Sequence, residues 1–324
     1  MTLRHQNQVL NIKETQPGNS KSAPTRPLRW EDDLSINALD REPFVNAIPL
    51  SQWDPADFRL INSGRIPSEI SHLEIERLKH AISKDSIPIP CSRDREGYGT
   101  DEHNEYYWLS GYRDYYVATV LAEKYGVELQ KTLELGAASG RVLRHFACQS
   151  DATEVWATEL NHRHIRWLSE FMPKQVLPIS LPALASLPME DNYFDAVLAY
   201  SVFTHCDIFE TGWLAEIRRV LKPGGIALLT AHTESTWAAM QQATTEDPDS
   251  LLRFEKAIPN LYELLENPMP EGHTGFRHTQ VGPYRGMAFH SISHIENVWG
   301  RFMEIEEVIP LGHARQTVIV LQKR

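Results

Sequence analysis

LELGAASGR, residues 133–141, decides the fold, because a strand-like apolar segment passes directly into a turn of small residues. We expect a helix to begin near Arg141. Small side chains at such a turn let a ligand approach the backbone, and the helix N-terminus offers unpaired N–H groups to an anionic group. The dinucleotide fingerprint G-x-G-x-x-G would need glycines at Ala138 and Arg141, and the G-K-[ST] of a Walker loop is also absent.

Short apolar runs alternate with helix-length segments on both sides of this turn. Such alternation is typical of βαβ units and a parallel sheet, so the fold class is α/β. Two further β-like runs near the C-terminus are joined by a short connection, which predicts a hairpin and an antiparallel last strand. The expected strands are Thr132–Leu135, Glu154–Thr158, Gln175–Ile179, Phe194–Tyr200, Gly225–Thr230, Met303–Ile309 and Gln316–Gln322.

The chain divides by composition into four parts. Residues 1–30 are polar and hold five basic residues and one acidic residue, as in a flexible tail. Residues 31–126 form a mainly helical extension, with one helix capped by Ser71 and a tyrosine-rich helix from 104 to 125. The α/β core comprises 127–231 and 290–324. Residues 232–289 are rich in proline and contain a helical run near 251–265. They form an insertion that we expect to act as a lid over the side of the sheet where the substrate enters.

Charge and hydropathy exclude several classes of partner. The 324 residues include 32 Lys and Arg against 43 Asp and Glu, a net charge of −11, which argues against binding to nucleic acid through a broad basic field. No stretch approaches the ~18 continuous apolar residues of a membrane span, and residues 1–16 lack the apolar run of a secretory signal. We expect a cytoplasmic protein that binds neither nucleic acid nor membrane, and the oligomeric state stays open.

Metal binding is not predicted from the spacing of the possible ligands. The three cysteines, Cys91, Cys148 and Cys206, are scattered, which excludes paired-cysteine zinc sites and disulfide frameworks. The histidines in and beside the insertion are irregularly spaced. They are His232, His273, His278 and His290.

Four motifs in order resemble class I S-adenosylmethionine-dependent methyltransferases. The glycine turn is followed, 23 residues after Gly136, by Glu159 at the end of the second strand, and a carboxylate ~20 residues after such a turn can reach ribose hydroxyls. LPMEDNYFD at 187–195 resembles the family's entry to strand four, YSVFTH at 200–205 the loop after it, and LKPGG at 221–225 the turn before strand five. The resemblance implies a Rossmann-like seven-stranded sheet preceded by a helical extension and interrupted by an insertion after strand five.

The resemblance also implies S-adenosyl-L-methionine as the cofactor and a set of residues that bind it. The turn would line the methionine moiety, Glu159 would hold the ribose, Tyr200 would lie beside the sulfonium, and two residues after strand three would flank adenine. Glu134 either binds the cofactor or supports the turn. The full set is Glu134, Gly136, Ala137, Ala138, Ser139, Gly140, Glu159, Leu160, Ala183, Leu184 and Tyr200. Ala138 replaces the usual central glycine, and Ala183 stands where many members have an aspartate.

The acceptor side is less well defined by sequence. His205 follows the fourth strand at the sheet edge where α/β ligands bind, and it is either a general base or a structural residue of the loop. The tyrosine-rich helix offers candidate substrate contacts, or simply a packed face. These contacts are Tyr107, Tyr112, Arg113 and Tyr116.

The sequence therefore predicts a methyltransferase that acts on a small molecule, a glycan or a natural-product intermediate. Methyl transfer from a sulfonium is an in-line displacement that needs alignment and exclusion of water more than a metal, and we expect an O or N acceptor. Two alternatives stay open: a non-catalytic binding module with this fold, and an aminopropyl transferase that uses the same type of cofactor pocket.

Overall fold

A computed structural model describes residues 44, 75–101, 103–206, 209–276 and 286–324 of the chain. The expected tail, the capping residue Ser71 and His278 lie outside these described residues. The chain separates into two compact units, which are described one at a time. The first unit contains the described residues up to Leu181 together with Tyr193–Leu198, and the second contains Pro182–Asn192 and Ala199–Arg324.

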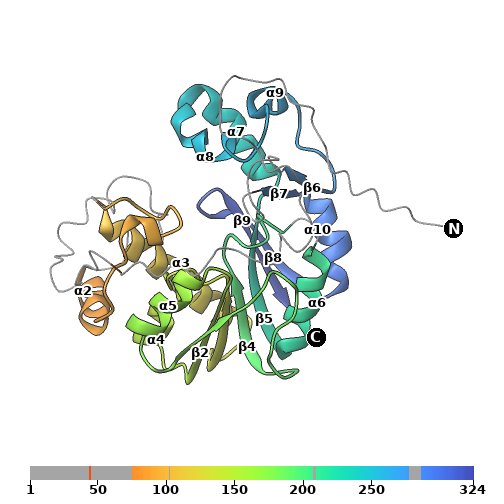
Figure 1. The fold of residues 1–324 in the computed structure, drawn as a ribbon. Coiled ribbons are helices and arrows are strands. Elements are labelled where there is room, and N and C mark those ends of the chain that lie inside the picture. Colours follow the sequence, from red (N-terminus) through yellow and green to blue (C-terminus); the bar gives the residue numbers. More distant parts are fainter. Residues whose placement is uncertain (1–43, 45–74, 102, 207–208, 277–285) are drawn as a thin grey trace, which may run out of the picture. The chain divides into compact units, whose positions relative to one another are not determined.

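The strands form a seven-stranded sheet with the order β3-β2-β1-β4-β5-β9-β8. Figure 1 labels β2, β4, β5, β8 and β9 of this sheet. Its β1–β2, β1–β4 and β2–β3 pairs are parallel, whereas β9 runs antiparallel to both β5 and β8. This confirms the predicted α/β class, the seven strands and the antiparallel last strand. The strands are β1 Lys131–Leu135, β2 Glu154–Glu159, β3 Val176–Ser180, β4 Phe194–Ala199, β5 Leu221–Ala231, β8 Glu304–His313 and β9 Gln316–Gln322.

The central strands are buried, which accounts for the continuous apolar runs in the sequence. Thr132–Leu135 of β1 and Ala196–Ala199 of β4 are continuously buried, as in parallel strands covered on both faces, and every residue of β9 is buried. β8 is mostly half-exposed, and its register against β9 shifts between Ile305 and Glu307 and between Ile309 and His313. Bulges of this kind are common in strands at the edge of a sheet.

The helices of the first unit include the predicted tyrosine-rich helix. It ends at Lys124 and is followed by Gly126 with a φ of +70°, the left-handed conformation that favours glycine. The helix after the glycine turn begins at Leu143, two residues later than expected. The helices are α2 Ile75–Lys84, α3 Asn104–Lys124, α4 Leu143–Gln149 and α5 His162–Phe171, with a short 3₁₀ turn at Ser92–Asp94.

The insertion has its own small core. Trp237, Met240, Phe254, Phe276 and Phe289 are buried together between its helices and a two-stranded antiparallel sheet. The helices lie together in Figure 1. The elements are α7 Glu234–Glu246, the 3₁₀ turn Pro248–Leu251, α8 Leu252–Glu255, α9 Leu261–Leu265, β6 His273–Phe276 and β7 Met287–His290.

The single helical run expected near 251–265 is wrong, because the structure divides it in two. Pro259 removes a backbone donor, and Asn260 takes a left-handed conformation with a φ of +54° between α8 and α9. The longest helix of the insertion, α7, was not predicted. Its N-terminus is stabilised by reciprocal hydrogen bonds between Thr233 and Thr236.

Three further helical elements complete the second unit. α6 Glu210–Val220 precedes β5, while α10 Ile292–Val298 and a 3₁₀ turn at Trp299–Arg301 precede β8. Ser291 caps α10 by accepting a hydrogen bond from the backbone N–H of His294.

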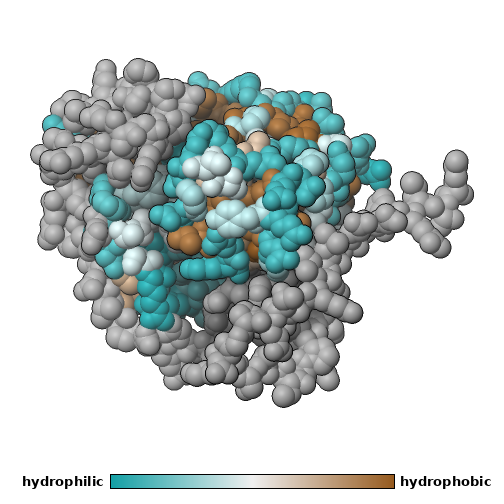
Figure 2. Space-filling model, turned by 90° about the horizontal axis from the view of Figure 1, so that it is seen from above, coloured by the Kyte–Doolittle hydropathy of each residue, from teal (hydrophilic) through white to brown (hydrophobic). Residues whose placement is uncertain are grey.

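The surface carries hydrophobic side chains among hydrophilic ones, as Figure 2 shows for one face. The large hydrophobic residues that are exposed come from several different elements. They are Val120, Leu184, Leu252, Tyr262 and Leu311. Among the described residues, no helix has both the length and the apolar character needed to cross a membrane.

A buried ion pair joins three segments of the first unit. Asp85 Oδ2 accepts hydrogen bonds from Arg144 Nε at 2.7 Å and Trp108 Nε1 at 2.9 Å, and Asp85 Oδ1 accepts one from Arg144 Nη2 at 3.0 Å. Neither charged side chain is exposed to solvent. Burial by itself would raise the pKa of Asp85, but Arg144 outweighs it and holds that pKa below its usual range.

We predict that Asp85→Ala lowers the free energy of unfolding by about 3 to 5 kcal/mol, because it leaves the Arg144 guanidinium buried without its carboxylate. Urea denaturation followed by circular dichroism measures the change. Glu304→Ala, which removes an exposed partner of Arg324, is the control and should barely move the transition. Equal shifts in the two variants would contradict the prediction.

Candidate functional site

The glycine turn between β1 and α4 is built from left-handed residues. Gly136, Ala138 and Gly140 have φ values of +70°, +47° and +81°. Ala138 therefore adopts the backbone conformation that a glycine would adopt, at the cost of strain that its Cβ introduces. The backbone N–H groups of Gly136 and Ala137 donate to Thr158 O at 2.8 and 3.1 Å, which ties the turn to the end of β2.

Gly140, which has a left-handed φ, also lies close to two side chains at the end of α5. A Cβ at this position would lie 2.3 Å from Met172 Cε and 2.9 Å from Leu168 Cδ2, at the end of α5. A side chain therefore fits here only if these neighbours move.

The Glu159 carboxylate lies at the tip of β2 and faces the turn. Its Oε2 accepts a hydrogen bond from Ala138 N at 2.7 Å, and its Oε1 accepts from Leu160 N at 2.7 Å and from Asn161 N at 2.9 Å. A carboxylate has about four acceptor positions. Glu159 is thus held in a fixed orientation and keeps acceptor capacity on Oε2.

Glu134 is buried within β1, just before the turn. Among the described residues, its Oε2 has no hydrogen-bond partner. Burial raises the pKa of Glu134 to about 8, against the opposing effect of Arg141. A buried carboxyl oxygen without a donor is uncommon, and it suits a ligand that brings a donor of its own.

Helix α3 packs directly on the turn. A Cβ at Gly111 would lie only 2.0 Å from Arg141 O, so the helix and the turn are in backbone contact. Tyr107 donates its hydroxyl hydrogen to Ser139 Oγ at 2.9 Å, and Ser139 Oγ donates in turn to Asp94 O at 2.5 Å.

Sequence reasoning missed one residue behind this arrangement, namely Asp94. Its carboxylate forms a buried ion pair with Arg163, whose Nε and Nη2 donate to Oδ1 and Oδ2 at 2.5 and 2.9 Å. The two residues are 69 positions apart, so no local pattern links them.

The predicted substrate contacts on α3 lie in different surroundings. Tyr107 and Tyr112 are 1% and 5% exposed, and Tyr112 stacks on Trp108 with ring centroids 5.3 Å apart. Arg113 pairs with Asp114 at 2.8 Å, and Tyr116 is half-buried. Their role in substrate binding stays a prediction.

The remaining predicted cofactor residues belong to the second unit. Ala183 is buried, whereas Leu184 is 39% exposed. Tyr200 is buried at the end of β4, where its ring lies 5.0 Å from that of His313.

His205 is oriented by a hydrogen bond to the backbone at Gly286, and within the described residues its other ring nitrogen is left as an acceptor. Its Nδ1 lies 2.7 Å from Gly286 O, and because a carbonyl only accepts, Nδ1 carries the hydrogen and Nε2 is left as a proton acceptor. Burial lowers the pKa of His205, partly offset by the Gly286 bond. The geometry is that of a group able to accept a proton at neutral pH.

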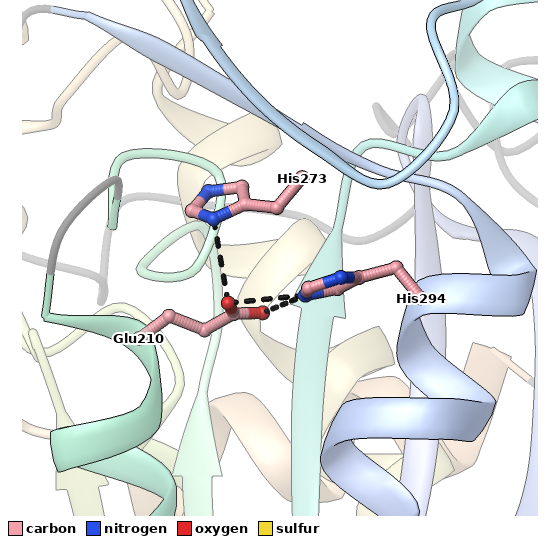
Figure 3. A group of neighbouring side chains, drawn as sticks. All are labelled: Glu210, His273 and His294. Carbon is pink, nitrogen blue, oxygen red and sulfur yellow. Dashed lines mark hydrogen bonds and ion pairs between the residues drawn. The ribbon is translucent and has the colours of Figure 1, made fainter. Parts of the chain in front are cut away.

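The second unit also holds a cluster that the sequence spacing did not predict. Glu210 at the start of α6 lies against His273, His290 and His294 (Figure 3 draws three of the four). Burial would raise the pKa of Glu210, but contacts with His290 and His294 outweigh it and hold that pKa well below its usual range. The residues are up to 84 positions apart, which is why spacing did not reveal them.

Comparison with known proteins supports the interpretation of residues 133–229, which match a family model described as a methyltransferase domain. The chain is 33% identical over 119 residues to a ubiquinone/menaquinone biosynthesis C-methyltransferase of Cupriavidus metallidurans, covering 35% of this chain and 47% of that protein. A protein of the same name from Paraburkholderia xenovorans is 36% identical over 118 residues, with 35% and 46% covered. The chain thus spans about half the length of these relatives.

Among solved structures, the fold is similar to that of the Burkholderia thailandensis 1,6-didemethyltoxoflavin-N1-methyltransferase with bound S-adenosylhomocysteine. The TM-score is 0.45 at 14% identity, covering 67% of this chain and 80% of that one. The sequence match, the strand order and the glycine turn agree with one another. Residues 133–229 are thus similar in sequence to methyltransferase domains, and the strand order and the glycine turn are consistent with that match.

Proposed function

We propose that this protein transfers the methyl group of S-adenosyl-L-methionine to a small-molecule, glycan or natural-product acceptor. The observation that carries the proposal is the left-handed turn at 136–140, with the Glu159 carboxylate fixed beside it by Ala138 N. When bound, the cofactor supplies a methyl group on a sulfonium with a good leaving group. The protein is then left to bind, align and exclude water.

The residues of the first unit fit this cofactor. The strained turn provides a close backbone approach for the methionine moiety, and the helix start behind it favours the carboxylate. Glu134 Oε2, which is buried and has no donor within the described part of the chain, suits the ammonium group of the same moiety. Glu159 would accept from the ribose hydroxyls through its remaining acceptor capacity.

In the second unit we assign adenine contacts to Ala183 and Leu184. Ala183 has no polar side chain, so the adenine amino group would be recognised through backbone groups and packing. Tyr200 is the proposed neighbour of the sulfonium. Leu160 is proposed as a further cofactor contact, since it follows Glu159 directly.

His205 is the proposed general base for an oxygen or nitrogen acceptor. Its Nε2 is positioned to take the acceptor proton because Nδ1 donates to Gly286 O. The relatives named as C-methyltransferases make carbon a second candidate for the acceptor atom. The matched region covers less than half of each relative, so their substrates are not assigned to this chain. Three expectations stay predictions: a cytoplasmic location, a lack of binding to nucleic acid, and methyl transfer without a metal.

Untargeted mass spectrometry of cell extract, incubated with the protein and methyl-labelled donor, tests the proposal. A labelled product that appears with the wild type and disappears with a binding-deficient variant would support it. Donor consumption without a methyl-labelled acceptor would favour the aminopropyl-transferase alternative, and no donor consumption at all would favour the non-catalytic one.

We predict that Gly136→Val abolishes binding of S-adenosylhomocysteine, because the side chain fills the turn and is strained at a φ of +70°. Isothermal titration calorimetry measures the affinity. Gly126→Val is a matched control, since Gly126 has the same φ but nothing within 4 Å of its Cβ position. Undiminished binding by Gly136→Val would refute the cofactor assignment.

We also predict that Glu159→Ala weakens binding of S-adenosylhomocysteine by about 1 to 3 kcal/mol, through loss of charge-assisted hydrogen bonds to the ribose. The same calorimetry measures it. Glu170→Ala, an exposed carboxylate on α5, should leave the affinity unchanged. If both variants bind as tightly as the wild type, Glu159 does not contact the cofactor.

For an oxygen or nitrogen acceptor, we expect His205→Gln to lower kcat by about 10²- to 10⁴-fold. A base must be unprotonated, and burial holds the pKa of His205 below 6.5, so the wild-type rate should fall only as the pH drops through that lowered pKa. A pH–rate profile on the identified acceptor checks this. His162→Gln, at a position on α5, is the control. An acid limb that persists in His205→Gln would assign the base elsewhere.

A further inference from the structure

The cluster around Glu210 brings together four elements of the second unit. Glu210 is the first residue of α6, and His273 on β6 is paired in register with His290 on β7. This pairing stacks the two imidazoles with centroids 4.5 Å apart and planes within 8°. His294 lies four residues after His290, in the first turn of α10.

Three donor atoms converge in this cluster (Figure 3). Glu210 Oε2 lies 3.4 Å from His273 Nδ1 and 3.1 Å from His294 Nε2. One ligand atom from each of these residues lies within 4.8 Å of the other two. Small movements of the side chains would bring all three to the 2.0–2.2 Å that zinc–nitrogen and zinc–oxygen bonds require.

The other carboxylate oxygen, Glu210 Oε1, has further contacts within the protein. Trp299 Nε1 donates a hydrogen bond to Glu210 Oε1, and His290 Nε2 lies 3.3 Å from that same oxygen. His294 Nε2 lies 3.1 Å from both oxygens, whereas His273 Nδ1 pairs with Oε2, so Oε2 is the oxygen that both proposed imidazole ligands share. A ligating carboxylate is normally oriented by outer contacts such as those of Oε1.

Because the cluster is buried, protein groups alone stabilise it poorly. The side chains of Glu210, His273 and His294 are 5%, 9% and 16% exposed, and His290 is fully buried. Protonating the three imidazoles would place three positive charges around one carboxylate in a desolvated site. His290 Nδ1 has no hydrogen-bond partner among the described residues.

We propose that Glu210 Oε2, His273 Nδ1 and His294 Nε2 bind a divalent transition-metal ion of the zinc type. Imidazole nitrogen and carboxylate oxygen are suitable ligands for such ions, and three protein ligands leave at least one position for water.

The ion would connect the start of α6 to β6 and α10. It would hold the two-stranded sheet of the insertion to the segment that follows β4. This inference concerns binding alone and stands apart from the displacement chemistry, because the sulfonium brings its own leaving group. It is therefore tested without a methyl donor.

The experiment uses the full chain after dialysis against a chelator. Titration with zinc chloride by calorimetry should give one ion per chain. Cobalt(II) should give the intense visible absorption of a four-coordinate site rather than the weak bands of the hydrated ion. His273→Gln, His294→Gln and Glu210→Gln should each weaken zinc binding by about 100-fold. His103→Gln, an exposed histidine that pairs with Glu105, is the matched control and should bind as the wild type does.

Three outcomes would overturn the proposal: no zinc binding at micromolar concentration by the wild type, affinities in the three variants equal to that of His103→Gln, or cobalt spectra of the hydrated ion alone. Circular dichroism of each metal-free variant guards against loss of fold. If Glu210→Gln is unfolded, the two histidine variants decide. Calorimetry with S-adenosylhomocysteine on the same samples reports separately on the cofactor site, so failure of one assignment is distinguishable from failure of the other.

Discussion

The structure of the first unit depends on one constraint: the chain must leave β1 through a turn whose backbone is left-handed at three positions. This conformation is costly for Ala138, and it persists because its surroundings fix it from several sides. Thr158 O accepts from two of its amides, Glu159 accepts from a third, and Gly111 lets α3 reach Arg141 O. The end of β2 and the face of α3 therefore hold a turn that would not keep this shape alone.

Local sequence patterns predicted the structural features that depend on residues close together in the chain. The parallel strands were visible as apolar runs because β1 and β4 are continuously buried, and the end of α3 was visible because Gly126 marks it. The glycine turn and Glu159 were likewise recognised from type and spacing. The start of α4 lies two residues after the expected Arg141, a difference that is ordinary for helix ends.

What the sequence did not predict depends on contacts between distant segments. Asp85 meets Arg144 across 59 positions, Asp94 meets Arg163 across 69, and Glu210 meets its histidines across as many as 84. No periodicity within a helix or strand encodes such pairings. Helix α7 was missed for a smaller reason, since Thr236 rather than Glu or Gln completes its capping box.

The backbone contact between Gly111 and Arg141 bears on where the folding unit of this chain begins. The segment that matches the methyltransferase-domain family model starts at residue 133. The turn inside that segment is nevertheless supported from outside it, by α3 and by the carbonyl of Asp94. The boundary of the matched segment therefore differs from the boundary of the structure that supports its turn. Any fragment that begins at residue 133 would lack both supports, and the left-handed turn would lose the contacts that fix its shape.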